Sequence, residues 1–198
     1  MILGPDGAGK STVIRGLMNR LNQAKSVVTM RHLKPQIVLA RRGELEAINS
    51  NPHGKPLRSA LTSIAKILVW FMEEWYAHLF QDERNALLIC DRYYHDLLVD
   101  PIRYLYGGPL WMARLIGELM PQPELWVLLD APAEILQMRK QEVGRVESAR
   151  QRQAYLTFVS KRRQHIIVDS AQPLDCVIAD VEKAIAGMNY PKAHPESA

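Results

Sequence analysis

The chain has 198 residues, 47% of them apolar, so it can bury one hydrophobic core; we expect a single domain over residues 1–190 and a flexible tail over 191–198. Its two cysteines are too few for a disulfide framework or a zinc quartet, and no run of about eighteen uncharged apolar residues predicts a membrane span. The N-terminus lacks the basic and apolar segments of a secretion signal, so we expect a cytoplasmic protein.

The formal net charge of +4 is unevenly distributed along the chain. Between Arg139 and Arg163 there are eight Lys or Arg residues but only two Glu residues. A basic cluster on an otherwise near-neutral protein suits a compact polyphosphate better than a long nucleic-acid track, so we expect no nucleic-acid partner. About half of these cations are expected on a solvated helix face.

Apolar runs of strand length occur at residues 1–3, 26–30, 86–90, 125–129 and 165–168. Their continuous apolarity indicates strands that are buried on both faces. The first run is shorter than the strand that usually precedes a phosphate-binding loop, which predicts further strand residues upstream of Met1.

Helical patterns alternate with these strands. One covers residues 11–21, and another has apolar residues at spacings of three and four between positions 57 and 79. The irregular, proline-containing segments 34–56 and 99–109 are expected to form loops over the ligand-binding edge of the sheet. Strands that alternate with helices predict right-handed crossovers, a parallel sheet and therefore an α/β fold.

Residues 4–11 match the phosphate-binding pattern Gly-x-x-x-x-Gly-Lys-Ser, known as Walker A, between a strand and a helix. Glycines let backbone N–H groups converge on an anion, and the N-terminus of the following helix adds a positive dipole. We expect Lys10 to reach the β and γ phosphates of ATP and Ser11 to bind Mg²⁺. The predicted ATP-binding residues are Gly4, Asp6, Gly7, Ala8, Gly9, Lys10, Ser11 and Thr12.

Carboxylates at strand ends are further candidates for the site. Asp91 follows the predicted strand 86–90 and is expected to orient the Mg²⁺ shell, while Arg92 can hold a phosphate. Asp6 is predicted to accept a hydrogen bond from a hydroxyl of the phosphate acceptor, because it would repel bound polyphosphate. Asp130 either reaches the same edge or caps the following helix, and we favour the cap.

In the order of these motifs the sequence resembles the thymidylate kinase family of nucleoside monophosphate kinases. The resemblance covers nearly the whole chain, and the motifs that carry it lie at residues 4–12, 91–93, 123–130, 145–147 and 165–169. It implies a P-loop NTPase fold in which helices flank a five-stranded parallel sheet. It also implies a lid within the segment from Arg139 through Arg150, and a homodimer.

The resemblance implies roles for individual residues. Arg139 and Arg145 match the lid arginines that neutralise phosphate charge, Asp6 matches the acid that contacts the acceptor sugar, and Arg92 matches the arginine that holds the acceptor phosphate. A phosphate acceptor is already ionised, so the reaction needs positioning rather than a general base. The leading hypothesis is therefore an ATP- and Mg²⁺-dependent kinase of a nucleoside monophosphate, with dTMP as the first acceptor to try.

The acceptor side departs from the family pattern. Trp75 and Ala77 stand where the family carries an arginine and a glutamine, and we favour a core position for Trp75 over stacking on a base. A kinase of the same fold that acts on a sugar, a sugar phosphate or another small metabolite is a second hypothesis, for which residues 49–57 offer polar and basic groups. The third is a nucleotide-binding regulatory module without turnover.

Overall fold

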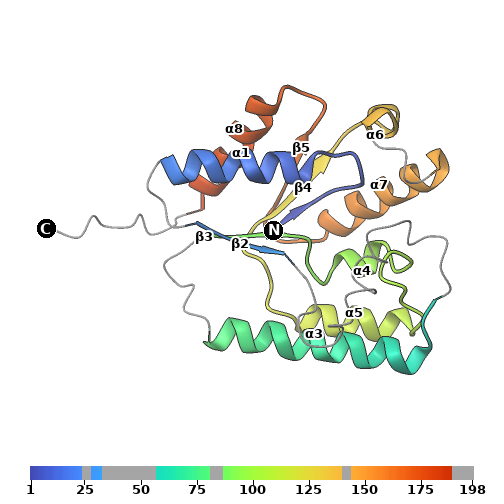
Figure 1. Cartoon of the computed structure of the whole chain (residues 1–198). Helices are drawn as coiled ribbons and strands as arrows, with labels where there is room; N and C mark the ends of the chain where they lie inside the picture. Colours follow the sequence, from blue (N-terminus) through green and yellow to red (C-terminus); the bar gives the residue numbers. More distant parts are fainter. Residues whose placement is uncertain (24–27, 33–56, 81–86, 140–143, 189–198) are drawn as a thin grey trace, which may run out of the picture. The chain divides into compact units, whose positions relative to one another are not determined.

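A computed structural model of the chain describes residues 1–23, 28–32, 57–80, 87–139 and 144–188 (Figure 1). The predicted loop over 34–56 and the predicted tail over 191–198 lie outside the described residues. The chain divides into two compact units. Unit 1 comprises Met1–His32, Asp82–Asp91 and Glu124–Ala198, and unit 2 comprises Leu33–Gln81 and Arg92–Pro123.

Unit 1 is built on a five-stranded parallel sheet, which confirms the predicted α/β fold of the P-loop NTPase type. Its strands are β1 (Ile2–Leu3), β2 (Val28–His32), β3 (Leu87–Asp91), β4 (Trp126–Asp130) and β5 (His165–Asp169). They lie in the order β2-β3-β1-β4-β5, so the short β1 is the central strand. Crossovers from β1 and from β4 therefore leave in opposite directions, which is where ligands bind in open α/β sheets.

The predicted strand ends are too early by one residue at two functionally important positions. Pairing in the parallel ladder continues to Asp91, which is in register with His32, and to Asp130, which is in register with Asp169. Both carboxylates thus belong to the last residue of a strand rather than to the following loop. Hydrophobicity alone ends a strand at the last apolar residue, whereas backbone pairing takes no account of side-chain polarity.

The helices of unit 1 are α1 (Lys10–Gln23), α6 (Ala133–Arg139), α7 (Arg145–Val159) and α8 (Leu174–Ala186). Leu17 of α1 and Val181 of α8 are fully buried in one core cluster with Val127 of β4. The neighbouring Trp126 instead packs its ring against Phe158 of α7. Because successive side chains of a strand point to opposite faces, α7 covers the face of the sheet opposite to α1 and α8 (Figure 1).

Unit 2 contains α3 (Ala60–Phe80), α4 (Asp96–Val99) and α5 (Leu110–Leu119). The predicted long helix begins at Ala60 because the hydroxyl of Ser59 accepts a hydrogen bond from the N–H of Thr62 at 3.3 Å, as an N-cap does. Residues 100–109 form turns and irregular backbone, as predicted. Within the described ranges, none of the helices combines the length and the apolar character that a membrane crossing requires.

Candidate functional site

The predicted phosphate loop connects β1 to α1 at the centre of the sheet in unit 1. The N–H of Ala8 donates to the carbonyl of Pro5 at 3.2 Å, and the N–H groups of Thr12 and Val13 both donate to the carbonyl of Gly9 at 3.0 Å. The loop is therefore closed by its own backbone before the first turn of α1 begins. A strand, a tight loop and the N-terminus of a helix follow one another as the motif requires.

Two glycines of this loop are required for different physical causes: Gly7 because of a close approach, and Gly9 because of its backbone conformation. At Gly7, where φ is 87°, an added Cβ would lie 2.5 Å from the carbonyl oxygen of Leu136 in α6, so the close approach excludes a side chain. At Gly9, where φ is 81°, an added Cβ would meet no atom within 4 Å. Gly9 is thus required by backbone conformation, and it leaves open space beside the loop.

Lys10 is buried, although it carries a charge. Its Nζ donates to the carbonyl oxygen of Gly4, and also to that of Pro5 at 3.0 Å. The amine therefore lies on the inner side of the loop, where its charge is held by the carbonyl groups of the first loop residues. Ser11 and Thr12 are exposed at the start of α1, while Asp6 is buried within the loop.

Asp91 lies on the strand next to the one that leads into the loop. It is in register with Ile2 of β1 and is 7% exposed. Among the residues that the structure describes, no group of three or more His, Cys, Asp or Glu side chains could hold a metal ion. The combination of one carboxylate and the Ser11 hydroxyl nevertheless suits Mg²⁺, which takes one or two carboxylates and completes its shell with phosphate oxygens and water.

Asp130 at the end of β4 does not cap the following helix, so the favoured interpretation was wrong. Its two carboxylate oxygens accept hydrogen bonds from Nε and Nη2 of Arg152 in α7, both at 2.7 Å. Helix α6 begins three residues later, after Pro132, whose carbonyl accepts the N–H of Leu136. The bidentate bond to Asp130 also raises the pKa of Arg152 above its ordinary value.

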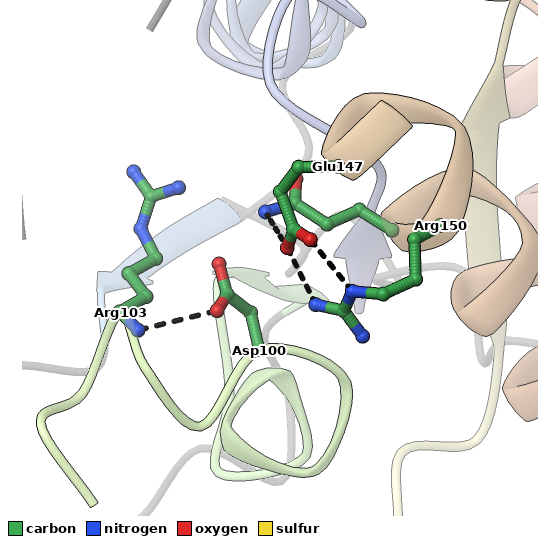
Figure 2. Close-up of polar contacts among 5 residues, drawn as sticks. Asp100, Arg103, Glu147 and Arg150 are labelled. Atoms are coloured by element: carbon green, nitrogen blue, oxygen red, sulfur yellow. Dashed lines mark hydrogen bonds and ion pairs between the residues drawn. The ribbon is translucent and has the colours of Figure 1, made fainter. Parts of the chain in front are cut away.

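Other cations of the basic segment are also engaged within unit 1. Arg139 at the end of α6 donates to the carbonyl of Ser170 at 2.9 Å. Arg150 donates twice to the carboxylate of Glu147, at 2.6 and 2.8 Å (Figure 2). The guanidinium of Arg162 lies 4.3 Å from the ring centre of Phe158. Residues 140–143 and the side chain of Arg145 lie outside the described part of the chain, so the lid stays a prediction.

Arg92 opens the second segment of unit 2. Its φ is 67°, a left-handed conformation that a non-glycine residue rarely adopts. Its Nη1 lies 3.9 Å from a carboxylate oxygen of the buried Asp96. The residue predicted to hold an anionic group therefore lies beside a buried carboxylate of its own unit.

Comparisons with known proteins agree with this geometry. The thymidylate kinase of Pediococcus pentosaceus is 26% identical over 90% of this chain and 91% of its own length. A probable thymidylate kinase of Methanocorpusculum labreanum is 27% identical over 93% of this chain and 96% of its own length. The zinc import ATP-binding protein ZnuC of Hydrogenovibrio crunogenus is 26% identical over 71% of this chain and 52% of its own length. The chain is distantly related to P-loop kinases. No family model matches it.

Trp75 is half-buried and makes contacts within unit 2, so it does not occupy the core position that we favoured. Its indole N–H donates to the carbonyl of Leu119 at 3.0 Å, and its ring packs edge-on against Phe71 and His78. Ala77 is buried. The polar and basic stretch of residues 49–57 lies almost entirely outside the described residues.

Sequence reasoning missed two charged residues with defined partners. No sequence pattern indicated the ion pair of Arg152, because its partner Asp130 is 22 positions away in the chain. The position of Lys66 could have been noticed, since it is the single cation within the apolar run 61–71. Its Nζ is buried, donates to the carbonyl of Tyr104 at 3.2 Å and lies 4.6 Å from the ring centre of Trp70.

Proposed function

We propose that this protein is an ATP- and Mg²⁺-dependent kinase that phosphorylates a nucleoside monophosphate, with dTMP as the first acceptor to test. The observation that carries the proposal is the conformation of residues 4–12 between β1 and α1, with the carboxylate of Asp91 at the end of the neighbouring strand. The two similar proteins named as thymidylate kinases support the choice of reaction.

On the donor side, residues 4–12 would surround the phosphates of ATP with backbone N–H groups. Lys10 already points into the loop, and the β and γ phosphates would replace the carbonyl groups that hold it now. Ser11 and Asp91 would hold Mg²⁺ directly or through water, and the bound ion supplies charge neutralisation on the phosphates. Ser11 is exposed and Asp91 is buried beside β1, which fits a direct contact of Ser11 with the ion and a contact of Asp91 through water.

On the acceptor side, Arg92 would bind the acceptor phosphate and Asp6 would accept a hydrogen bond from a sugar hydroxyl. Arg139 and Arg145 would neutralise the charge that moves during transfer. No residue has to remove a proton, because the acceptor oxygen is already ionised at neutral pH. The chain's own contribution to rate is thus positioning and charge stabilisation.

A panel of dTMP, dUMP, UMP, CMP, AMP and GMP with ATP and Mg²⁺ tests the proposal by release of ADP. With at least one acceptor we expect the protein to release ADP above background. Lys10→Ala should lower kcat/KM by at least about 100-fold. Lys183→Ala, which changes a lysine of α8 far along the chain from the loop, is the matched control and should leave the rate unchanged. Absence of transfer to every nucleotide of the panel would refute this function.

A second candidate is a kinase of the same fold that acts on a sugar, a sugar phosphate or another small metabolite. The observation that favours it is the engagement of Trp75 with Leu119 and the burial of Ala77, which leave these two positions without a group that reads a base. Turnover of a non-nucleotide acceptor, without turnover of the panel, would establish it. Tight ATP binding without transfer to any acceptor would instead indicate a regulatory module.

A further inference from the structure

Three consecutive side chains hold the backbone that follows Arg92 against α5. They belong to Tyr93, Tyr94 and His95, and all three are buried. One polar side-chain atom of each lies 2.8 to 2.9 Å from a backbone carbonyl oxygen of α5 or of the residues just after it. The residue that comes next, Asp96, therefore starts α4 from a fixed position.

The backbone of Asp96 is itself bonded on both sides. Its N–H donates to the carbonyl of Tyr93 at 3.0 Å, and its carbonyl accepts the N–H of Asp100 at 2.9 Å. The side chain of Asp96 is only 3% exposed. Carboxylates are rarely buried to this extent unless a cation lies beside them, because removal of their charge from water is costly.

The cation beside this carboxylate is Arg92. Its Nη1 lies 3.9 Å from Oδ2 of Asp96, at the distance of an ion pair, and the two residues are four positions apart. The side chain of Arg92 is 19% exposed, so an anion from solvent can approach the guanidinium more readily than the carboxylate. The left-handed φ of Arg92, 67°, is a conformation that persists only where surrounding contacts enforce it, often at ligand sites.

We propose that Asp96 is a positioning residue, which holds the guanidinium of Arg92 in the orientation that binds the anionic group of the acceptor. The proposal rests on the function given to Arg92 above. A long flexible side chain loses conformational freedom when it binds an anion, and a partner that orients it beforehand lowers this cost. Asp96 thus affects acceptor binding without contacting the acceptor.

The sign of the effect distinguishes this role from a competing one. A carboxylate that competed with the acceptor for the guanidinium would weaken acceptor binding, so removal of its charge would lower the acceptor KM. A carboxylate that orients the guanidinium does the opposite, and removal of its charge raises the acceptor KM.

The first test is steady-state kinetics with ATP and dTMP, or with the best acceptor of the nucleotide panel. We expect Asp96→Asn to raise the acceptor KM by about 10-fold, while the KM of ATP stays within about twofold. Asp175→Asn makes the same change at an ion pair of α8 with Arg20 and should leave both KM values within about twofold. An acceptor KM that is unchanged or lower in Asp96→Asn would overturn the proposal.

A double-mutant cycle separates the positioning role from a general structural one. In an Arg92→Ala background, Asp96→Asn has no guanidinium left to affect and should change the acceptor KM by less than about twofold. The same rise in both backgrounds would show that Asp96 acts by another route. Asp96→Glu keeps the charge beside Arg92 and is the variant to measure where Asp96→Asn does not fold. It displaces the carboxylate by one methylene group and should raise the acceptor KM at least about threefold, whereas a wild-type value would overturn the proposal.

The second test does not depend on turnover. Crystal structures of the wild type and of Asp96→Asn, both without ligand, give the orientation of the Arg92 side chain. We expect the guanidinium to lie beside Asp96 in the wild type and to be reoriented or without ordered density in the variant. The same orientation in both would overturn the proposal. A changed orientation in a protein that phosphorylates no nucleotide of the panel would refute the proposed function while leaving the positioning of Arg92 by Asp96 in place.

Discussion

Asp130 and Arg152 form a partly buried ion pair of unit 1, with two hydrogen bonds that are both 2.7 Å long. The carboxylate is 14% exposed and the guanidinium 35%, so water screens this pair less than it screens a surface pair. We expect Asp130→Asn to lower the free energy of unfolding by about 1–3 kcal/mol, because a partly buried cation loses its charged partner. Urea denaturation measures the change.

Two further variants make the comparison specific. Arg152→Lys keeps the positive charge but should lose most of the stability that the pair contributes, since an ammonium group cannot donate two hydrogen bonds in the geometry of a guanidinium. Arg150→Lys changes a more exposed pair with Glu147 and should cost less than about 1 kcal/mol. Equal losses for Asp130→Asn and Arg150→Lys would contradict the greater contribution that we expect from the more buried pair.

Gly9 separates the conformational from the steric role of a loop glycine. With φ at 81° and open space where a Cβ would be added, we expect Gly9→Ala to lower the free energy of unfolding by only about 1–2 kcal/mol. ATP binding should fall by at least about 10-fold, because the methyl group would occupy the space beside the loop. Titration calorimetry with ATP measures the affinity, and unchanged affinity would contradict a phosphate site there.

Gly144→Ala is the control for this experiment. Gly144 precedes α7 with φ at −63°, which alanine adopts without strain, and an added Cβ meets no atom within 4 Å. Both the stability and the ATP affinity of this variant should match those of the wild type. The comparison attributes any loss in Gly9→Ala to the phosphate loop rather than to a general effect of removing a glycine.

The sequence predicted the strand, loop and helix around residues 4–12 better than it predicted the ion pairs of unit 1. The hydrogen bonds that close the loop of residues 4–12 join residues only a few positions apart, so the spacing of the motif alone indicates its structure. Asp130, in contrast, offered a local cap partner and a distant one, and local propensity pointed to the wrong choice. Contacts over long sequence separation, such as those of Arg152 and Lys66, require knowledge of how the elements pack.

At the scale of elements, the apolar periodicity predicted all five strands and the long helix of unit 2. It could not fix the strand ends, because the ladder pairs backbone groups of Asp91 and Asp130 regardless of their polarity. It also could not show that α3 is apolar on more than one side. Trp70 is buried inside unit 2, while Leu68 and Met72 are 48% and 67% exposed.

The outward stripe of α3 is the surface through which we expect the predicted homodimer to form. The stripe consists of the exposed residues Leu61, Leu68, Met72, Tyr76 and Leu79, none of which is charged. They follow one another at spacings of three, four and seven positions, as in helices that pack against each other along their length. Two copies of one helix can place the same stripe against itself about a twofold axis.

Sedimentation equilibrium tests this interface. The wild type should sediment as a dimer and Leu68→Glu as a monomer, because a buried carboxylate would be left without a partner. Leu174→Glu alters a leucine of α8 that is exposed to a similar extent, 42% against 48%, and should remain dimeric. A monomeric wild type would exclude the homodimer.

At the scale of the whole molecule, the two units have interleaved sequences. Unit 2 consists of one segment that follows β2 and another that follows β3, so no single linker separates the units along the chain. This arrangement explains why the composition and the positions of proline and glycine predicted one domain over residues 1–190. Where the chain passes several times between two units, no single segment has the composition of a linker. That domain assignment stays a prediction.

The protein should lose stability at alkaline pH. Burial raises the pKa of three tyrosines of unit 2, Tyr94, Tyr104 and Tyr106. A raised pKa in the folded state stabilises the protein while the group is protonated, and this contribution is lost as pH rises above the unfolded value of about 10. The free energy of unfolding should therefore fall above that pH.

Urea denaturation between about pH 8 and about pH 11 measures this dependence. Each buried phenol contributes a slope of up to about 1.4 kcal/mol per pH unit, so Tyr94→Phe should make the decline shallower than in the wild type. A decline that is the same in both proteins would show that Tyr94 is not its source.

The central position of β1 also determines when the protein can fold during synthesis. The nitrogen of Met1, directly before this strand, donates to the carbonyl of Leu125, 124 positions later, and β1 is flanked by β3 and β4, which are made long after it. The loop of residues 4–12 therefore leaves the ribosome before β3 and β4, and its supporting sheet forms only after β4 has emerged. Contacts of such long sequence separation slow folding, so the nascent chain exposes its glycine loop to proteases and chaperones until β4 has been made.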